Sequence, residues 1–516
     1  MNELHTNYDE GGASRPDSSS PHDGQHANRG NHILSRAQRL VERGRAAQER
    51  WSYQPLEQRM AALNRAAREM LRSRSEAMEL ARDEMGKVEA EGLFNETLGP
   101  VDAVAAWARV VRQATRPGAI RLNPINFPGK HATVEHLPRG VVGIIAPWNF
   151  PIAGLYRAVI PALLTGNAVI VKPSPFTPRS SAWFVDRLAS ELPVGLAQCL
   201  LGDRAAGEAI IDAGIDACVF TGSTRSGRAV QVHCAERGIP CSAEMGGKDA
   251  AIVLQDCDLA RTVAGITHWT LSNAGQACGA IEIAYVDEAI ANEFVARVGR
   301  VFAALDATSV APLANQAQFD LVTSHVNDAR TSGAALITGG YARDGLWYAP
   351  TLLDRCGARM AVVREETFGP VLAVVRVSGV SDAINAINHG RYGLGASIWT
   401  SDIPRAKRLA SRLDVGVVNI NNHAFSGAIP SLPWSGTRDT GFGVANSAFA
   451  LPTFVRPRVT TVDLSKGPEL YFMPYDRTLM ELGNLLADAQ LGKLTHAWKI
   501  PLLLRQRLQS LRDFFR

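Results

Sequence analysis

Three short apolar runs alternate with helical segments in the first half of the chain, at residues 140–147, 168–171 and 217–220. Such runs, bounded by glycine, proline or a charged residue, are typical of strands that are buried on both faces of a parallel sheet. The intervening segments 151–164 and 179–190 have the length and apolar spacing of crossover helices. A βαβ series of this kind predicts a parallel sheet that is covered by helices.

A second series of strands and helices follows the Gly246-Gly247 pair. Residues 250–254, 284–286 and 371–377 have the apolar character of its strands. Adjacent glycines suit a crossover between two domains, although a simple tight turn accommodates them equally well. The chain therefore predicts an α/β fold with two domains, and it is long enough to build a core in each.

The two ends of the chain differ from this body. Residues 1–31 are polar and lack an apolar core segment, which predicts a disordered tail and no secretory signal. Residues 32–96 have helical spacing that Pro55 interrupts, so at least two helices are expected. Residues 465–516 predict a basic amphipathic extension, because residues 493–516 carry a net charge of +5 beside a leucine-rich side. Such a helix can lie on a membrane, but docking on its own protein or on a neighbouring subunit is the commoner use.

Composition excludes several classes of protein. The net charge is only +4, and the body has no basic stripe, zinc-ligand spacing or RNA-binding signature, so neither nucleic acid nor a metal site is predicted. No run of 18 apolar residues exists, and no transmembrane helix is expected. The seven cysteines are odd in number and form no CxxC pair, which favours reduced thiols in the cytoplasm.

Cys278 and Glu244 are the strongest candidates for chemistry. A thiolate forms covalent intermediates, and a carboxylate can activate the water that later cleaves them. Each residue lies among small neighbours, in the segments 273–278 and 244–248. Alone, a cysteine is more often a small core residue and a glutamate a solvated surface group. The interpretation therefore depends on the surrounding motifs.

Three further segments favour a phosphate-bearing cofactor and an oxyanion. Residues 220–227 follow a strand and open a helix, where Gly222, Ser223 and Gly227 would let a dinucleotide approach the helix N-terminus. This is not the full GxGxxG fingerprint, and a plain strand–helix turn is the alternative. Lys172 ends a predicted strand, at the edge where open α/β sheets bind ligands. Asn149 lies in a turn between two prolines, where a fixed amide could stabilise an oxyanion.

Together these segments resemble the aldehyde dehydrogenase superfamily, in the order of that family and over about residues 38–463. Six segments carry the resemblance: Pro147–Pro151 (PWNFP), Val171–Ser174 (VKPS), Phe220–Gly227 (FTGSxxxG), Glu244–Lys248 (EMGGK for ELGGK), Gly275–Cys278 (GQxC) and Glu365–Val371 (EExFGPV).

The resemblance implies a role for each matched residue. Cys278 would be the nucleophile, Glu244 the general base, and Asn149 an oxyanion donor together with the Cys278 backbone N–H. Lys172 and Glu366 would hold ribose hydroxyls, and Phe368 would pack near the nicotinamide. Trp148, Gly222 and Ser223 would line the path of the adenosine and the pyrophosphate. The implied reaction oxidises an aldehyde to a carboxylic acid with NAD(P)+ through a thiohemiacetal and a thioester.

The resemblance also implies an organisation. It implies a Rossmann-like cofactor domain within residues 32–244, a catalytic domain over 245–421, and a return segment and oligomerisation arm over 422–464, with part of 121–139 in the arm. Homodimers or homotetramers are implied by the family alone. Residues 470–475 resemble tails of bacterial and class 3-like members that often take apolar or aromatic aldehydes.

One departure bears on the cofactor. Pro175 stands where the family often has a glutamate that binds the adenosine ribose, so NAD with relaxed discrimination is expected and NADP is not excluded. The alternatives to hydrolytic aldehyde oxidation are a CoA-acylating dehydrogenase, a cysteine hydrolase or acyltransferase without a redox cofactor, and an inactive scaffold. Glu244 argues against the first, the Gly222 loop against the second, and the intact Cys278, Glu244 and Asn149 against the third.

Overall fold

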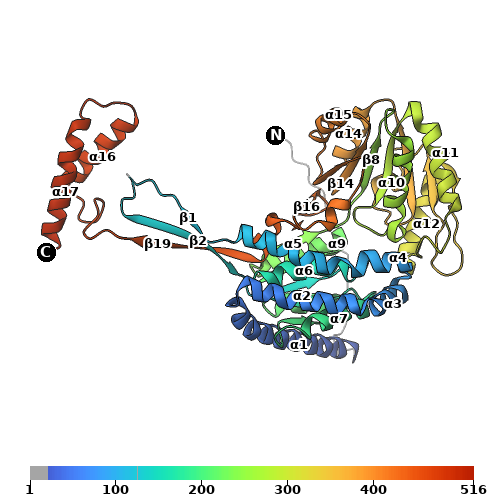
Figure 1. Cartoon of the computed structure of the whole chain (residues 1–516), viewed down its shortest axis with the longest axis horizontal. Coiled ribbons are helices and arrows are strands. Elements are labelled where there is room, and N and C mark those ends of the chain that lie inside the picture. Colours follow the sequence, from blue (N-terminus) through green and yellow to red (C-terminus); the bar gives the residue numbers. More distant parts are fainter. Residues whose placement is uncertain (1–20, 125) are drawn as a thin grey trace, which may run out of the picture. The chain divides into compact units, whose positions relative to one another are not determined.

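The computed structural model describes residues 21–124 and 126–516, with side chains from residue 31 onward. The chain forms two units by internal contacts. The larger unit contains residues up to Arg116 together with His136–Arg456, and the smaller contains Pro117–Glu135 and Pro457–Arg516. Figure 1 shows the two sheets of the larger unit, and the ribbon and helices of the smaller unit.

The first sheet of the larger unit is parallel throughout and has the order β5-β4-β3-β6-β7. Its strands are β3 (Val141–Ile145), β4 (Ala168–Lys172), β5 (Ala197–Cys199), β6 (Ala217–Thr221) and β7 (Cys241–Glu244). The connecting helices are α6 (Ala153–Leu164), α7 (Pro178–Ala189), α8 (Arg204–Asp212) and α9 (Thr224–Glu236). Every residue of β3 and β4 is buried, which is why these strands read as continuous apolar runs.

The helices before this sheet are α1 (Pro21–Ser52), α2 (Leu56–Arg72), α3 (Arg74–Met85), the short α4 (Glu89–Glu91) and α5 (Gly99–Ala114), with a π-helical turn at Gly92–Thr97. Pro55 separates α1 from α2, as the sequence predicted. The predicted disordered tail to residue 31 is too long, because α1 already begins at Pro21. Residues 1–20 lie outside the described part of the chain.

The second sheet begins directly after the segment Glu244–Lys248 and has the order β10-β11-β12-β9-β8-β14-β15. Its strands are β8 (Asp249–Val253), β9 (Ile281–Asp287), β10 (Ala335–Thr338), β11 (Thr351–Asp354), β12 (Val371–Val377), β14 (Gly395–Trp399) and β15 (Val417–Ile420). The described pairings are parallel except that of β10 with β11. The main helices are α10 (Leu259–Leu271), α11 (Glu288–Ala304), α12 (Gln316–Thr331), α14 (Val380–Asn388) and α15 (Ile403–Ala410).

The alternation of side chains along β8 builds a core on each face of the second sheet. Ala251 and Val253 join one apolar cluster with residues of α10 and α11. Ala250 and Ile252 join a second cluster with residues of α14 and α15. Successive side chains of a strand point to opposite faces, so one run of four apolar residues supplies both cores.

After β15 the chain returns to the first sheet through short pairs. β13 (Tyr392–Gly393) pairs with β17 (Thr437–Arg438), and β16 (Trp434–Ser435) pairs with β18 (Val444–Ala445). The Gly443 N–H donates to the Ala243 carbonyl at 3.0 Å, and the Met245 N–H donates to the Thr440 carbonyl at 2.8 Å. The return segment is thereby fixed beside Glu244.

The smaller unit combines a ribbon of strands with two helices. The ribbon has the order β1-β2-β19, from β1 (Gly118–Ile120), β2 (Lys130–Pro138) and β19 (Val455–Asp463). The extension after it forms α16 (Arg477–Gln490) and α17 (Ile500–Phe514), which pack against each other. Arg507, one of the basic residues of the predicted amphipathic extension, is not on its surface: it is completely buried and donates to the Leu470 carbonyl at 3.0 Å and to Asp476 at 2.8 Å. Among the described residues, no helix has the length and apolar character needed to span a membrane.

Candidate active site

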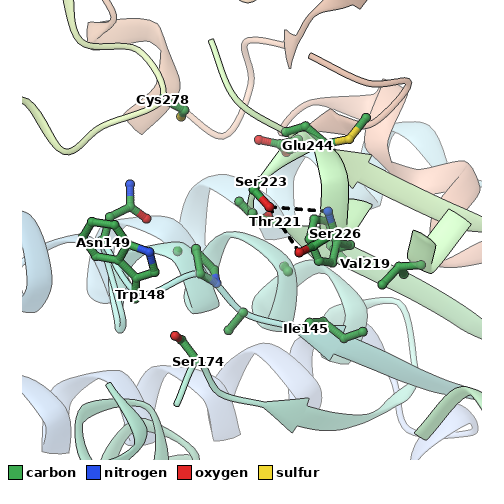
Figure 2. Close-up of a pocket in the computed structure, with 18 of the residues that line it drawn as sticks. Ile145, Trp148, Asn149, Ser174, Val219, Thr221, Ser223, Ser226, Glu244 and Cys278 are labelled. Atoms are coloured by element: carbon green, nitrogen blue, oxygen red, sulfur yellow. Dashed lines mark hydrogen bonds between the residues drawn. The ribbon is translucent and has the colours of Figure 1, made fainter. Parts of the chain in front are cut away.

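The predicted site residues gather around one cavity of the larger unit, with a volume of about 940 Å³. It opens at the carboxyl ends of β3, β4, β6 and β7, and loops of the second sheet close it from the other side. Nine of the ten predicted residues line it, namely Trp148, Asn149, Lys172, Gly222, Ser223, Glu244, Cys278, Glu366 and Phe368. Figure 2 shows Cys278, Asn149 and Glu244 arriving from three separate segments. Gly227 does not line the cavity.

The backbone before Cys278 is held in a conformation that few residues adopt. Asn273, Ala274 and Gly275 have φ values of 53°, 55° and 72°. Left-handed conformations at residues other than glycine cost about 1–3 kcal/mol each and persist where the surroundings determine them. Here Asn273 Nδ2 donates to the Asn149 carbonyl at 3.0 Å, and Gln276 Oε1 accepts from the Ala314 N–H at 2.8 Å. The thiol is therefore presented by a strained and tightly held loop.

Two glycines allow the segments of this site to approach one another. A Cβ on Gly275 would lie 2.1 Å from the Gly369 carbonyl oxygen, and a Cβ on Gly247 would lie 2.4 Å from the Cys278 carbonyl oxygen. No side chain fits at such distances, and Gly275 also has a positive φ. The glycines of the GQxC and EMGGK segments thus bring Cys278 next to the connection between the two sheets.

Asn149 is buried in the turn after β3 and contacts the loop of Cys278. Its Nδ2 donates to the Gln276 carbonyl at 3.0 Å, two residues before the thiol. An asparagine amide carries two N–H donors, so this bond leaves one for another acceptor. The arrangement fixes the amide plane beside the Cys278 loop, as an oxyanion donor would require.

Glu244 ends β7, and its charge is balanced by Arg157, which the sequence analysis missed. Arg157 Nη2 lies 3.9 Å from Glu244 Oε2, and the guanidinium lies over the Trp434 ring. The Arg157 Nε and Nη2 atoms are buried without a hydrogen-bond partner in the described part of the chain. Burial raises the pKa of Glu244, and the positive charge of Arg157 opposes that rise. No motif in the sequence marks Arg157. The one sign that it could reach the site was its position on α6, soon after the Pro147–Pro151 turn.

The surroundings of Cys278 favour the protonated form of its thiol. Burial raises its pKa to about 12, the negative charge of Glu244 adds to the rise, and Arg157 counteracts it. Since the thiolate is the nucleophile, this cavity holds back the reactive form until further positive charge or hydrogen bonding reaches the sulfur. The two groups proposed for chemistry therefore share one electrostatic environment.

The remaining lining residues fit a dinucleotide. Ser223 caps α9, because its Oγ accepts from the Ser226 N–H at 3.4 Å, and residues of the N-terminus of this helix line the cavity. Burial lowers the pKa of Lys172, and Asp203 opposes that shift. Trp148 and Phe368 meet edge to face, with ring centroids 5.5 Å apart. Gly227 instead lets α9 pack closely on Met245, the residue after β7, since a Cβ there would lie 2.5 Å from Met245 Sδ.

Glu366 belongs to a buried cluster of charged groups. Burial raises its pKa to about 8, the neighbouring Glu282 adds to the rise, and the Gly247 N–H donates to Oε1 at 2.8 Å. Glu282 is in turn paired with Lys248. A carboxyl group that is close to neutral in the resting site can still accept hydrogen bonds from ribose hydroxyls.

Comparison with known proteins agrees with this geometry. The sequence model of the aldehyde dehydrogenase family matches residues 13–460. A Methylomonas sp protein named 4,4'-diapolycopene aldehyde oxidase is 35% identical over 445 residues, covering 85% of this chain and 84% of that protein. A Mycolicibacterium smegmatis protein named "Putative succinate-semialdehyde dehydrogenase", with NADP(+) in its name, is 36% identical over 420 residues, covering 79% and 80%. The crystal structure of lactaldehyde dehydrogenase from Escherichia coli matches with a TM-score of 0.78 at 28% identity, covering 83% and 91%.

Proposed function

Since this chain belongs to the aldehyde dehydrogenase family and is an NAD(P)-dependent enzyme that oxidises aldehydes to carboxylic acids, we propose that it does so through a covalent intermediate on Cys278. The observation that carries the proposal is the convergence of Cys278, Glu244 and Asn149 on one cavity from the two sheets. These residue types are a nucleophile, a general base and an oxyanion donor.

The proposed mechanism assigns one task to each group. The Cys278 thiolate attacks the aldehyde carbon, and the Asn149 side chain and the Cys278 backbone N–H hold the oxyanion that forms. NAD(P)+, when bound, supplies the hydride acceptor. The thiohemiacetal loses hydride and leaves a thioester on the Cys278 sulfur. Glu244 then removes a proton from the attacking water, so that the carboxylate product leaves and the thiol is regenerated.

In this proposal the cofactor is held by the residues that line the rest of the cavity. Lys172 and Glu366 bind ribose hydroxyls, and the N-terminus of α9 at Gly222 and Ser223 receives the pyrophosphate. Trp148 and Phe368 form the apolar wall beside the rings. The fit is supported by the capped helix N-terminus and by the buried polar side chains that face the cavity.

The test is the formation of NAD(P)H from an aldehyde in the absence of CoA. We expect Cys278→Ala to lower kcat/KM by at least about a thousandfold, because the covalent route is lost. Glu244→Gln is expected to form one equivalent of NAD(P)H rapidly and then to stall as a thioester that intact-mass measurement detects. Cys257→Ser, which removes a thiol outside the cavity, is the matched control. Full activity of Cys278→Ala, or activity that requires CoA, would refute the proposal.

For the cofactor we propose NAD with relaxed discrimination, so that NADP is also accepted. Pro175 lines the cavity and stands where the family often has a carboxylate that would repel a 2′-phosphate, and Arg225 also lines the cavity. Arg204 lines the cavity too but is paired with Glu208 at 2.7 Å. The relatives with NADP(+) in their names support this proposal. Comparison of kcat/KM for the two cofactors tests it, and Pro175→Glu is expected to lower the NADP value by about tenfold or more while sparing NAD.

For the substrate we propose an apolar aldehyde, supported by the relative named for diapolycopene aldehyde. One observation favours an acidic semialdehyde instead, because Arg157 offers a guanidinium in the cavity and several relatives are named for succinate semialdehyde. The kcat/KM values of a long alkyl aldehyde, benzaldehyde and succinate semialdehyde separate the two. A strong preference for succinate semialdehyde that Arg157→Met abolishes would refute the apolar proposal.

For the smaller unit we propose contact with a second copy and with a membrane surface. The β19 residues after Val455 are exposed, and an open strand ribbon of this kind can pair with another chain. The extension also combines exposed apolar side chains with basic ones, as a helix at a membrane surface does. The exposed apolar residues are Trp498, Leu502, Phe514 and Phe515, and the basic residues of the same segment include Lys493, Lys499, Arg505 and Arg512. Light scattering after gel filtration tests the homodimer or homotetramer. Cosedimentation with anionic vesicles, compared with neutral vesicles and with Trp498→Ser, tests the membrane contact.

For the compartment we propose the cytoplasm. All seven cysteines are free, which suits a reducing environment. Cell fractionation tests the location, and recovery of the protein in a secreted fraction would refute it.

A further inference from the structure

Three thiols meet on one face of the first sheet, away from Cys278. Cys218 on β6 and Cys241 on β7 are directly opposite in the parallel register. Side chains at opposite positions of neighbouring parallel strands point to the same face of the sheet. Cys234 lies near the end of α9, the helix that connects these two strands and packs on both. Three separate elements therefore bring one sulfur each to the same point.

The spacing of the sulfurs matches what a soft metal ion needs. The three sulfur atoms all lie within 4.8 Å of one another. Zinc–thiolate bonds of about 2.3 Å place two sulfurs of a tetrahedral or trigonal site about 3.8–4.0 Å apart. Shifts of about 1 Å or less, which cysteine side chains can supply by small rotations, therefore bring all three into contact with one ion.

The burial of the cluster distinguishes it from an exposed thiol group. Cys218 and Cys234 are completely buried, and Cys241 is partly exposed. A single buried cysteine is ordinarily a small apolar residue, and that reading would suffice for each of them alone. Three cysteines from three elements in mutual contact present three soft ligand atoms to one point. A disulfide would join two of them at about 2.05 Å and leave the third unused.

We propose that Cys218, Cys234 and Cys241 together bind one thiophilic metal ion, Zn²⁺ or Cu⁺, through three thiolates. Each thiol loses its proton as its metal–sulfur bond forms, so binding releases up to three protons and changes no oxidation state. Cu⁺ would be satisfied by three sulfurs. Zn²⁺ would add a water from the partly exposed side at Cys241.

An ion in the cysteine cluster would also affect the cavity proposed for the cofactor. Cys234 follows His233 and Cys241 precedes Ser242, and both His233 and Ser242 line the cavity proposed for the cofactor. An ion at the three sulfurs would tie the end of α9 to β6 and β7, and so fix that wall. We expect metal loading to raise the thermal midpoint of the full chain, because an ion that binds only the folded state stabilises it.

The test uses the full chain carrying Cys278→Ala, so that the thiol of the catalytic cavity adds no signal. The reduced, chelator-treated enzyme is titrated anaerobically with Co²⁺ as a spectroscopic substitute for Zn²⁺, and separately with Cu⁺ against a chromophoric competitor. We expect one ion per chain and, for Co²⁺, the intense sulfur-to-cobalt charge-transfer band in the near ultraviolet. Saturation by Co²⁺ and Zn²⁺ identifies a zinc-type site, and tight binding of Cu⁺ alone identifies a copper site.

The variants Cys218→Ala, Cys234→Ala and Cys241→Ala should each abolish the band and the rise in thermal midpoint, whereas Cys257→Ser should keep both. Circular dichroism checks that each variant is folded. X-ray absorption of the loaded parent, which needs no cluster variant, should count about three sulfurs at about 2.3 Å. Absence of saturable binding, an unchanged band in Cys234→Ala, or a disulfide within the cluster in cells lysed with a thiol-blocking reagent would overturn the proposal.

Discussion

Replacing Arg157 by methionine removes the positive charge that faces both proposed catalytic groups. Arg157 lowers the pKa of Glu244 and that of Cys278, each against a larger rise caused by burial. In the proposed mechanism both groups act in their deprotonated forms. Loss of the guanidinium should therefore raise both pKa values and move the acid limb of the pH profile of kcat/KM to higher pH.

The size of the shift follows from the ion-pair distance. Two unit charges 3.9 Å apart, the separation of Arg157 Nη2 and Glu244 Oε2, attract by about 4 kcal/mol at an effective dielectric constant of about 20. This energy is an upper bound on how far Arg157 stabilises the ionised form of Glu244. The Arg157 side chain is 25% exposed, and solvent screening reduces the effect. We expect a displacement of about one to two pH units.

The assay is kcat/KM against pH for an uncharged aldehyde, so that Arg157 has no substrate carboxylate to bind. Arg157→Lys keeps the charge and should retain most of the wild-type profile. Arg157→Met keeps an apolar contact over the Trp434 ring. A profile of Arg157→Met that is unmoved, or moved to lower pH, would refute the electrostatic role, even if the absolute rate fell.

Three further changes test other parts of the structure. Gly275→Ala should lower the free energy of unfolding, measured by urea denaturation, by about 1–3 kcal/mol. Its Cβ would lie 2.1 Å from the Gly369 carbonyl oxygen, and its φ is +72°. Gly379→Ala is the control and should change this free energy little, because the space around Gly379 is open. The cofactor-free enzyme should lose stability as pH rises from about 4.5 to about 8. Over this range the raised pKa of Glu366 keeps the carboxyl group neutral in the folded state, whereas it ionises in the unfolded state. Glu366→Gln should flatten this dependence of stability on pH. Arg507→Met should speed amide exchange in α17, because it removes the hydrogen bonds to Leu470 and Asp476, without lowering kcat.

The sequence predicted the parts of the fold whose residues are buried on both faces. Strands β3, β4 and β6 read as short apolar runs and were predicted within a few residues. Strand β14 was missed, because Gly395, Ala396 and Ser397 are small and carry no apolar pattern. The helix from Pro21 was missed because its first residues are polar, and a hydrophobic period is the main helical signal.

In the candidate site, too, some residues could be predicted from the sequence and others could not. Cys278, Glu244 and Asn149 could be predicted because each lies in a local motif, and all three line the cavity. Arg157 lies in no motif, and only packing brings it to Glu244. The three clustered cysteines are separated by stretches of different length that match no metal signature, and β-strand register brings them together. Arg507 was counted with the basic residues of the amphipathic extension, whereas it is buried and bonded to Leu470 and Asp476, which precede α16.

The connection Glu244–Lys248 is where the two sheets become chemically dependent on each other. Glu244 ends the first sheet, Lys248 pairs with Glu282 of the second, and between them Gly247 touches the carbonyl of Cys278. The same Gly247 N–H donates to Glu366, a residue proposed to hold the cofactor. Any side chain at Gly247 must push the Cys278 loop away from Glu244 and at the same time weaken the hold on Glu366. Changes there should therefore lower kcat and raise the KM of the cofactor together, whereas a change at Lys172 should act on the cofactor alone.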